Sequence, residues 1–190
     1  MDSLSSQVQT YSPKYLIFDF DQTIAKLDMD WSGWAHGIAT ILRSFASDGE
    51  QIDEKNVNYI VQAKFIQKYG TNLADELKKF ESEYQYAHYR GVIPNADVIS
   101  IIHSSPVPKF IWTSNPKNVI DRVLAELHLS NEFQKIATRD DVVFTKPNPE
   151  GFQLLSTNLS QAPTDWLMIG DSIFDQEAAK NAGIGFVRII

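Results

Sequence analysis

The 190-residue sequence contains no cysteine, which excludes disulfides, thiolate nucleophiles and thiolate metal sites. It also lacks any apolar run near the ~18 residues of a membrane helix, and its first residues have neither the basic region nor the apolar run of a targeting peptide. Positive charge is scarce: 17 Lys and Arg against 24 Asp and Glu give a net charge of -7, so nucleic acid and anionic membranes are poor first guesses as partners. We therefore expect a cytoplasmic protein with a loose leader at residues 1–13, and nothing in the sequence indicates its oligomeric state.

Four short apolar runs are typical of strands that are buried on both faces of a parallel sheet. They lie at residues 15–18, 110–112, 166–169 and 186–190, and the first three end in polar or acidic residues. A chain of this length holds one well-packed core, or one core with a small accessory domain.

Helical patterns with recognisable ends separate these runs. Asn115 and Asn148 are each followed by proline, which predicts an N-cap and a first helical residue, and a last helix over residues 174–182 should stop at Gly183. Strand and helix alternate from residue 94 onward. This alternation predicts an α/β fold with a right-handed, doubly wound parallel sheet.

The long interval over residues 24–91 departs from this alternation. It shows helical stretches at residues 34–46, 54–69 and 73–89, and no convincing strand. We predict a small all-helical cap domain at residues 24–91, inserted into an α/β core domain made of residues 14–23 and 92–190.

Polar residues follow the predicted strands at their carboxyl ends, the edge of an open parallel sheet that faces the ligand crevice. Taken singly, each has an ordinary explanation as a turn, a helix cap or a surface charge. An acid pair, hydroxyls, a lysine and a second acidic cluster, all at strand ends or adjoining loops, together indicate an active site. The residues are Asp19, Asp21, Thr113, Ser114, Lys146, Asp171 and Asp175.

These residues resemble the four motifs of the haloacid dehalogenase-like superfamily. The matching stretches are Asp19-Phe20-Asp21-Gln22-Thr23, Thr113-Ser114-Asn115, Lys146-Pro147 and Gly170-Asp171-Ser172 with Asp175. Residues 146–152 are further similar to the branch of phosphoglycolate phosphatases and β-phosphoglucomutases, which has a helical cap between the first two motifs. The resemblance spans residue 15 to the end and implies a Rossmann-like core. It also implies a Mg²⁺-dependent phosphohydrolase that acts on a small phosphorylated metabolite through an aspartyl phosphate.

The resemblance assigns different roles to the four aspartates. Asp19 would attack phosphorus and bind Mg²⁺, while Asp21 would give a backbone carbonyl to the metal and use its side chain as general acid and base. Asp171 would supply a second carboxylate to the metal. Asp175 would also belong to the metal site, mainly by supporting the residues that bind the metal directly.

The remaining motif residues would handle the phosphoryl group. Thr113 and the N–H of Ser114 would hold its oxygens, and Lys146 would offset the negative charge. One departure is Gln22, at a position that is often glycine in the family, which raises the question of the local backbone conformation.

Alternatives to a phosphatase remain open in the sequence. Asp21 argues against the dehalogenases and phosphonate hydrolases of the superfamily, which lack an acid there, whereas a phosphomutase or a non-catalytic binding module keeps the same fold. Lys26, Trp31 and Arg90 lie near the expected cap hinges and are candidates for contacts with the leaving group.

Overall fold

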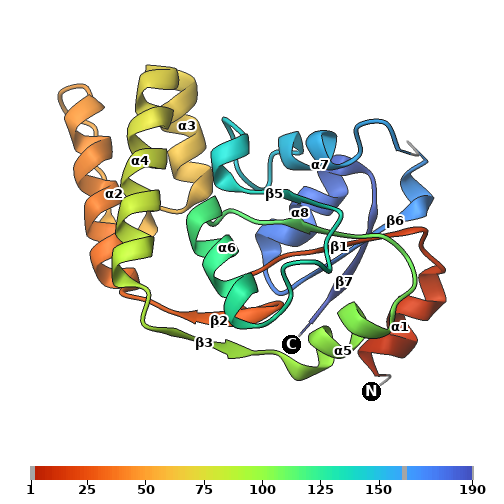
Figure 1. Ribbon diagram of the computed structural model, residues 1–190. Coiled ribbons are helices and arrows are strands. Elements are labelled where there is room, and N and C mark those ends of the chain that lie inside the picture. Colours follow the sequence, from red (N-terminus) through yellow and green to blue (C-terminus); the bar gives the residue numbers. More distant parts are fainter. Residues whose placement is uncertain (1–2, 160–161, 190) are drawn as a thin grey trace.

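The computed structural model describes residues 3–159 and 162–189, in which five parallel strands form the central sheet (Figure 1). The strand order is β5-β4-β1-β6-β7, and β1 in the centre pairs with β4 on one side and with β6 on the other. The predicted α/β class with a parallel sheet is confirmed. The strands are β1 (Tyr15–Phe18), β4 (Lys109–Trp112), β5 (Lys135–Ala137), β6 (Trp166–Gly170) and β7 (Gly185–Arg188).

Helices cover both faces of this sheet because each central strand is apolar on both sides. Leu16 and Phe18 of β1 pack into one apolar cluster, and Ile17 between them packs into the other. The first cluster is covered by α1 (Leu4–Tyr11), α5 (Ala96–Ser104) and α6 (Lys117–Glu126), and the second by α7 (Glu150–Leu155) and α8 (Ile173–Ala182). Short 3-10 turns lie at Arg139–Asp141 and Pro163–Asp165. None of the helices in the described residues has the length and apolar character needed to cross a membrane.

The N-terminal segment is more ordered than the sequence predicted. Residues 4–11 of the expected loose leader form helix α1, which begins at the N-cap Ser3 and packs against α5 and β7. Val8 is buried in the core, and the Tyr11 hydroxyl donates to the Phe186 carbonyl at 3.2 Å. Within residues 4–11 only the Val8 side chain is buried, so the sequence shows no helical periodicity of apolar residues there.

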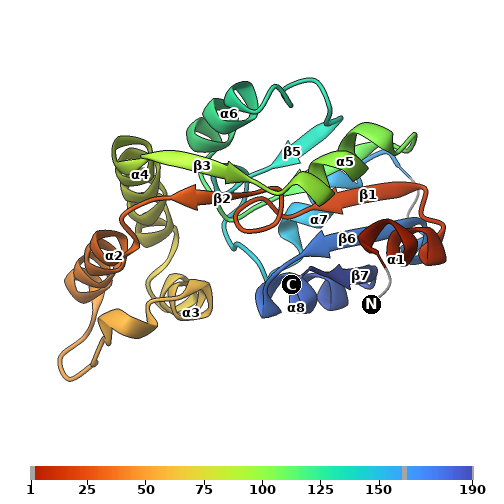
Figure 2. The ribbon, with the colours of Figure 1, turned by 90° about the horizontal axis from the view of Figure 1, so that it is seen from below.

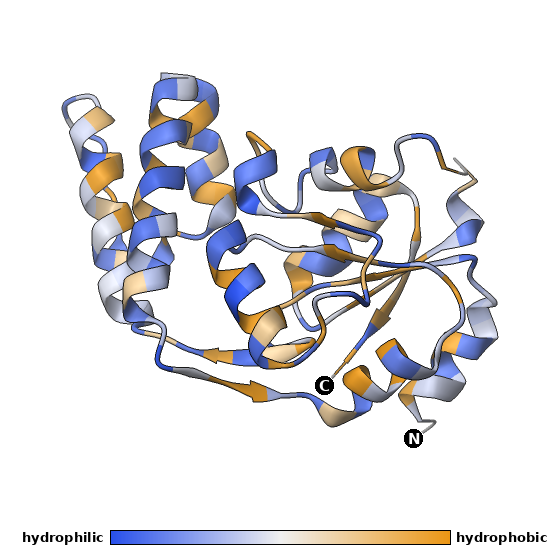
Figure 3. Cartoon of the chain, viewed as in Figure 1, coloured by the Kyte–Doolittle hydropathy of each residue, from blue (hydrophilic) through white to orange (hydrophobic). Residues whose placement is uncertain are grey.

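A separate group of helices stands beside the sheet, at the left in Figure 1. It consists of α2 (Trp31–Phe45), α3 (Tyr59–Tyr69) and α4 (Thr71–His88), with a 3-10 turn at Glu54–Asn56. Apolar and polar stretches alternate along these helices (Figure 3), and their apolar faces enclose a cluster of their own that includes Ile38, Leu42, Leu73 and Leu77. We refer to these helices as the cap.

Two antiparallel strands connect the cap to the sheet (Figure 2): β2 (Ala25–Asp28) and β3 (Gly91–Pro94). The first of them corrects the prediction that residues 24–91 contain no strand. Its side chains alternate between buried and exposed, but four residues are too few to establish this period against a helical background.

The predicted N-cap at Asn115 is wrong, since α6 begins at Lys117 with Pro116 as its N-cap. The Asn115 side chain instead accepts a hydrogen bond from Thr113 and donates one to Gln85 of α4. The Asn115 side chain thus makes a tertiary contact with Gln85 and does not cap the N-terminus of α6. The predicted N-cap at Asn148 is also wrong, since α7 begins at Glu150 with Pro149 as its N-cap, although the Asn148 side chain accepts from the Glu150 N–H at 3.0 Å.

The cap docks on the core through α4, which packs against α6. Asn118 of α6 donates to the Ser82 carbonyl at 3.1 Å, and the Tyr89 hydroxyl donates to Glu126 at 2.7 Å. These contacts join the two units away from the connecting strands. The cap therefore has a defined position relative to the sheet.

A buried ion pair forms a second contact between the units. Arg139 of the core is 3% exposed, and its Nε lies 2.9 Å from Oε2 of Glu81 on α4, which is fully buried. The guanidinium also donates to Gln62 of α3 at 2.8 Å. Burial raises the pKa of Glu81 to about 7 even though Arg139 lies beside it.

We predict that Arg139→Ala destabilises the protein by about 3 kcal/mol at pH 8, because it leaves the Glu81 carboxylate buried without its partner. The loss should be smaller at pH 5. The pKa of Glu81 is higher in the folded state than its ordinary 4.5, so the proton that neutralises it binds more tightly to the folded protein, and this contribution to stability disappears as the pH rises through 7. Denaturant unfolding at both pH values measures the difference.

The matched control is Lys117→Ala, which removes the exposed ion pair with Asp121. It should cost at most about 1 kcal/mol at pH 8. An equal loss for Arg139→Ala at pH 5 and pH 8 would contradict the account of a buried charge.

Candidate active site

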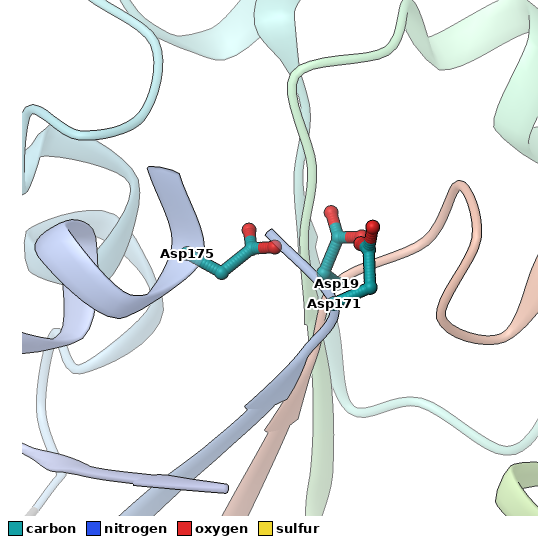
Figure 4. A group of neighbouring side chains, drawn as sticks. All are labelled: Asp19, Asp171 and Asp175. Atoms are coloured by element: carbon teal, nitrogen blue, oxygen red, sulfur yellow. The ribbon is translucent and has the colours of Figure 1, made fainter. Parts of the chain in front are cut away.

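The order of the strands places a crevice at the carboxyl ends of β1 and β6. From β1 the chain proceeds to β4 and β5 on one side, and then to β6 and β7 on the other, which makes this the switch point of the sheet. Asp19 directly follows β1, and Asp171 directly follows β6. In Figure 4 the two side chains lie next to each other, and Asp175 points toward them from α8.

The three carboxylates form a compact acidic cluster. One oxygen from each of Asp19, Asp171 and Asp175 lies within 4.8 Å of the others. Asp19 and Asp175 are buried and Asp171 is partly buried, so water screens their mutual repulsion poorly. A nearby cation is needed to stabilise the ionised forms of these three carboxylates.

Lys146 supplies one positive charge to this cluster. Its ammonium forms hydrogen-bonded ion pairs with both Asp19 and Asp175, and the lysine is 4% exposed. Burial disfavours the charged form of Lys146, but the two carboxylates outweigh this effect and hold its pKa above the ordinary value. The lysine therefore stays charged between the two acids.

Both carboxylate oxygens of Asp175 are engaged. One binds Lys146, and the other accepts from the N–H of Ser172 at 3.0 Å and from its hydroxyl at 2.6 Å, completing a capping box at the start of α8. A Cβ at Gly170 would lie 2.6 Å from the Asp175 Cβ, so the absence of a side chain there lets Asp175 approach the strand end. Asp175 therefore positions Lys146 and the loop that carries Asp171 and Ser172.

The pKa values of the three carboxyl groups show that Lys146 does not neutralise all of their negative charge. Burial, followed by repulsion from Asp175, raises the pKa of Asp19 to about 7, and the same two causes raise the pKa of Asp171. Burial opposes ionisation of Asp175 as well, but the Lys146 charge holds the pKa of this carboxyl below its usual value. A further positive charge beside Asp19 and Asp171 would therefore stabilise the ionised carboxylates.

Asp21 and its neighbours form the loop after Asp19. The Asp21 carboxylate accepts from the Leu27 N–H at 2.8 Å, and burial raises the pKa of Asp21 to about 6. Thr23 donates from its hydroxyl to Asp171 at 3.3 Å. Gln22 between them has a φ of 63°, the left-handed conformation that glycine adopts without strain, and its side chain is exposed.

The residues predicted to hold phosphoryl oxygens lie beside the cluster at the end of β4. Thr113 and Ser114 are both buried, and Ser114 lines the same cavity as Asp19 and Lys146. The Thr113 hydroxyl donates to Asn115 Oδ1 at 2.8 Å and accepts from the Asn115 N–H at 3.1 Å. Asn115 therefore fixes the Thr113 rotamer.

A cavity of about 390 Å³ opens above these residues, between the core and the cap. Its core wall includes Asp19, Asp21, Asp171 and Ser172. The structure thus brings together every predicted site residue, with Thr113 just behind the wall. The cap side is formed by Trp31, Trp34, Ala35, Glu54, Lys55, Val57, Asn58 and Tyr59.

Of the hinge residues proposed from the sequence, only Trp31 lies on this cavity. Lys26 is exposed on β2 and Arg90 is exposed between α4 and β3. Tyr59 of the cap and Phe174 of the core line the cavity without having been predicted. Phe174 stands next to Asp175 in the sequence, which could have indicated its position, whereas Tyr59 reaches the site only through the packing of the cap.

A family model described as haloacid dehalogenase-like hydrolase matches residues 16–189, nearly the whole chain. The chain belongs to this family. The haloacid dehalogenase-like core predicted from the four motifs is thereby confirmed, and the acidic crevice described above lies at the position of these motifs.

Two bacterial relatives of this haloacid dehalogenase-like chain carry names that state an activity. The chain is 33% identical to the phosphoglycolate phosphatase of Salmonella paratyphi A over 88 residues, which cover 46% of the chain and 35% of that protein. It is 31% identical to the pyrophosphatase PpaX of Listeria monocytogenes over 113 residues, which cover 57% of the chain and 52% of that protein. The chain thus matches only between a third and about half of the length of these relatives.

Solved structures share the fold. A hydrolase of this superfamily from Geobacter sulfurreducens is 19% identical, with a TM-score of 0.54 over 93% of the chain and 87% of that structure. CbbY from Rhodobacter sphaeroides, solved in complex with phosphate, is 16% identical, with a TM-score of 0.57 over 92% of the chain and 84% of that structure. At these identities the likeness concerns the fold alone.

The strained backbone at Gln22 leads to a prediction about stability. Gln22→Gly should stabilise the protein by about 0.5–1 kcal/mol, because glycine adopts a positive φ without the steric cost of a Cβ. The midpoint of thermal unfolding should rise by roughly 1–4 °C. Gln22→Ala is the control, since it removes the exposed side chain and keeps the Cβ. A gain of equal size in the alanine variant would contradict the account of backbone strain.

Proposed function

We propose that this chain is a Mg²⁺-dependent phosphohydrolase that hydrolyses a small phosphate monoester through an aspartyl phosphate on Asp19. The observation that carries the proposal is the buried contact of Asp19 with Lys146 beside Asp171, at the open end of the sheet. The names of the phosphoglycolate phosphatase and pyrophosphatase relatives support a phosphorylated substrate.

The acidic cluster fits a hard dication. Mg²⁺ prefers carboxylate, carbonyl and water oxygens and is usually held by one or two protein carboxylates. Asp19 and Asp171 would supply these, together with the backbone carbonyl of Asp21, while both oxygens of Asp175 already have partners. When bound, the metal would neutralise charge on the carboxylates and on the phosphoryl oxygens.

The protein residues divide the reaction between them. Asp19 would attack phosphorus, and Lys146 would lower the repulsion between this carboxylate and the anionic phosphoryl group. The Asp21 carboxyl would protonate the leaving oxygen and then take a proton from the attacking water. The Leu27 N–H holds the Asp21 carboxylate in place, the Ser114 N–H would bind an equatorial oxygen, and Thr113 would bind another after its hydroxyl turned from Asn115.

The dependence on metal can be tested without measuring activity. Mg²⁺ at 100 times its dissociation constant should stabilise the folded protein by about 2.7 kcal/mol, measured as an upward shift of thermal unfolding. Asp171→Asn should largely abolish this shift, while the exposed Asp121→Asn should retain it. In parallel, chelation should stop phosphate release. A full Mg²⁺ shift in Asp171→Asn would contradict the assigned site.

The roles of the acid pair can be separated by mutation. Asp19→Asn should abolish both turnover and phosphoenzyme formation, because it removes the nucleophile. Asp21→Asn should retain the nucleophile and reduce kcat by about 10²–10⁴-fold through the loss of general acid and base catalysis. Mass spectrometry of the trapped phosphoryl adduct checks the assignment, and an adduct on any residue other than Asp19 would refute it.

A further inference from the structure

A continuous row of aromatic rings forms one wall of the cavity. Trp31 and Trp34 of α2 lie with ring centroids 6.1 Å apart, Trp34 and Tyr59 of α3 also 6.1 Å apart, and Tyr59 and Phe174 of α8 6.4 Å apart, each pair edge to face. All four residues line the cavity. We refer to Trp31, Trp34, Tyr59 and Phe174 as the aromatic wall.

The aromatic wall leads from the cap to the phosphoryl site. Phe174 belongs to the core and immediately precedes Asp175, whereas the other three rings come from the cap. Trp31 at the other end is 37% exposed, and Trp34, Tyr59 and Phe174 are partly exposed. A phosphate bound at Asp19 would therefore place its leaving group alongside ring surface that is accessible in the cavity.

The size of the cavity allows a leaving group as large as a ring. Small-molecule pockets enclose ~300–1,000 Å³ and combine an apolar lining with a few polar groups that fix the orientation. The cavity volume of about 390 Å³ lies in this range. Near the aromatic wall, Asn58 and Tyr59 carry polar side-chain groups, of which Asn58 Oδ1 already accepts from the Ile60 and Val61 N–H groups at the start of α3.

The charges around the cavity disfavour a second anionic group on the substrate. Five acidic side chains and two lysines line it, in the part of the chain that the structure describes, and of the five acids Glu54 is paired with Arg43 at 2.9 Å. Lys146 is already bound by two carboxylates, so Lys55, which is exposed, is the remaining lysine. With a metal ion assigned to the phosphoryl group, an additional carboxylate or phosphate on the leaving group would meet mostly negative charge.

We propose that the substrate is a phosphate monoester whose leaving group carries an uncharged aromatic ring, which lies against the aromatic wall. This inference rests on the proposed function and names its class of substrate. It distinguishes the chain from an enzyme for phosphoglycolate or pyrophosphate, both of which carry further negative charge.

The test compares kcat/KM for benzyl phosphate, propyl phosphate and phosphoglycolate in the presence of Mg²⁺. Benzyl and propyl phosphate both release a primary alcohol, so a difference between them reports mainly on contacts of the ring. We expect benzyl phosphate to exceed propyl phosphate by at least about 5-fold, since ring contacts typically add a factor of ~2–12 beyond the burial of area, and phosphoglycolate to be the poorest of the three.

Two variants locate the preference on the aromatic wall. Trp31→Ala and Phe174→Leu should each reduce the ratio of benzyl to propyl phosphate by about 3- to 10-fold. Tyr11→Ala is the matched control: this ring is 48% exposed on α1, at the end of the molecule opposite the cap in Figure 1, and its loss should leave the ratio unchanged.

The outcomes separate this inference from the proposed function. A benzyl to propyl ratio near one, a preference for phosphoglycolate, or equal ratios in Trp31→Ala and the wild type would overturn the inference while phosphate release continued. If a folded protein released no phosphate from any of the three with Mg²⁺, the proposed function would fail as well.

Discussion

The contact of Lys146 with Asp19 and Asp175 is the interaction on which the site depends. Carboxylates that follow neighbouring strands of a parallel sheet inevitably crowd one edge, and burial there makes their repulsion costly. The lysine removes part of this repulsion, and the capping box of Ser172 holds Asp175 against it. The first turn of α8 thus has two functions, since it both starts a helix and positions the ammonium beside Asp19.

The same crowding makes the site a source of instability that the rest of the core must offset. Asp19 and Asp171 retain raised pKa values despite the lysine, which means that their ionised forms are unfavourable in the folded protein. The left-handed backbone at Gln22 adds a local cost in the loop that carries Asp21. A bound dication would reverse the sign of the first effect, because it favours the ionised carboxylates.

The acidic cluster could be predicted from the sequence because Asp19 and Asp171 each directly follow a strand, and strands of a parallel sheet share one functional edge. The apolar runs before Asp19 and Asp171 were sufficient to place both. Arg139 and Tyr59 could not be found in this way, since their surroundings are created only when the cap packs on the core. The prediction for Asn115 failed for the same reason: its partner is Gln85, on another unit, and not its own helix.

The packing of the cap on the core also determines where the aromatic residues of the cavity lie. Arg139 pairs with Glu81 and Gln62 of the cap, and its guanidinium lies 5.8 Å from the ring centroid of Tyr59. The residue that anchors the cap is therefore in contact distance of the aromatic wall. Because separating this pair inside the protein would leave two buried charges without partners, the contact restrains the cap at this point. The Tyr59 end of the aromatic wall is thus held beside this ion pair, in addition to the contacts between α4 and α6.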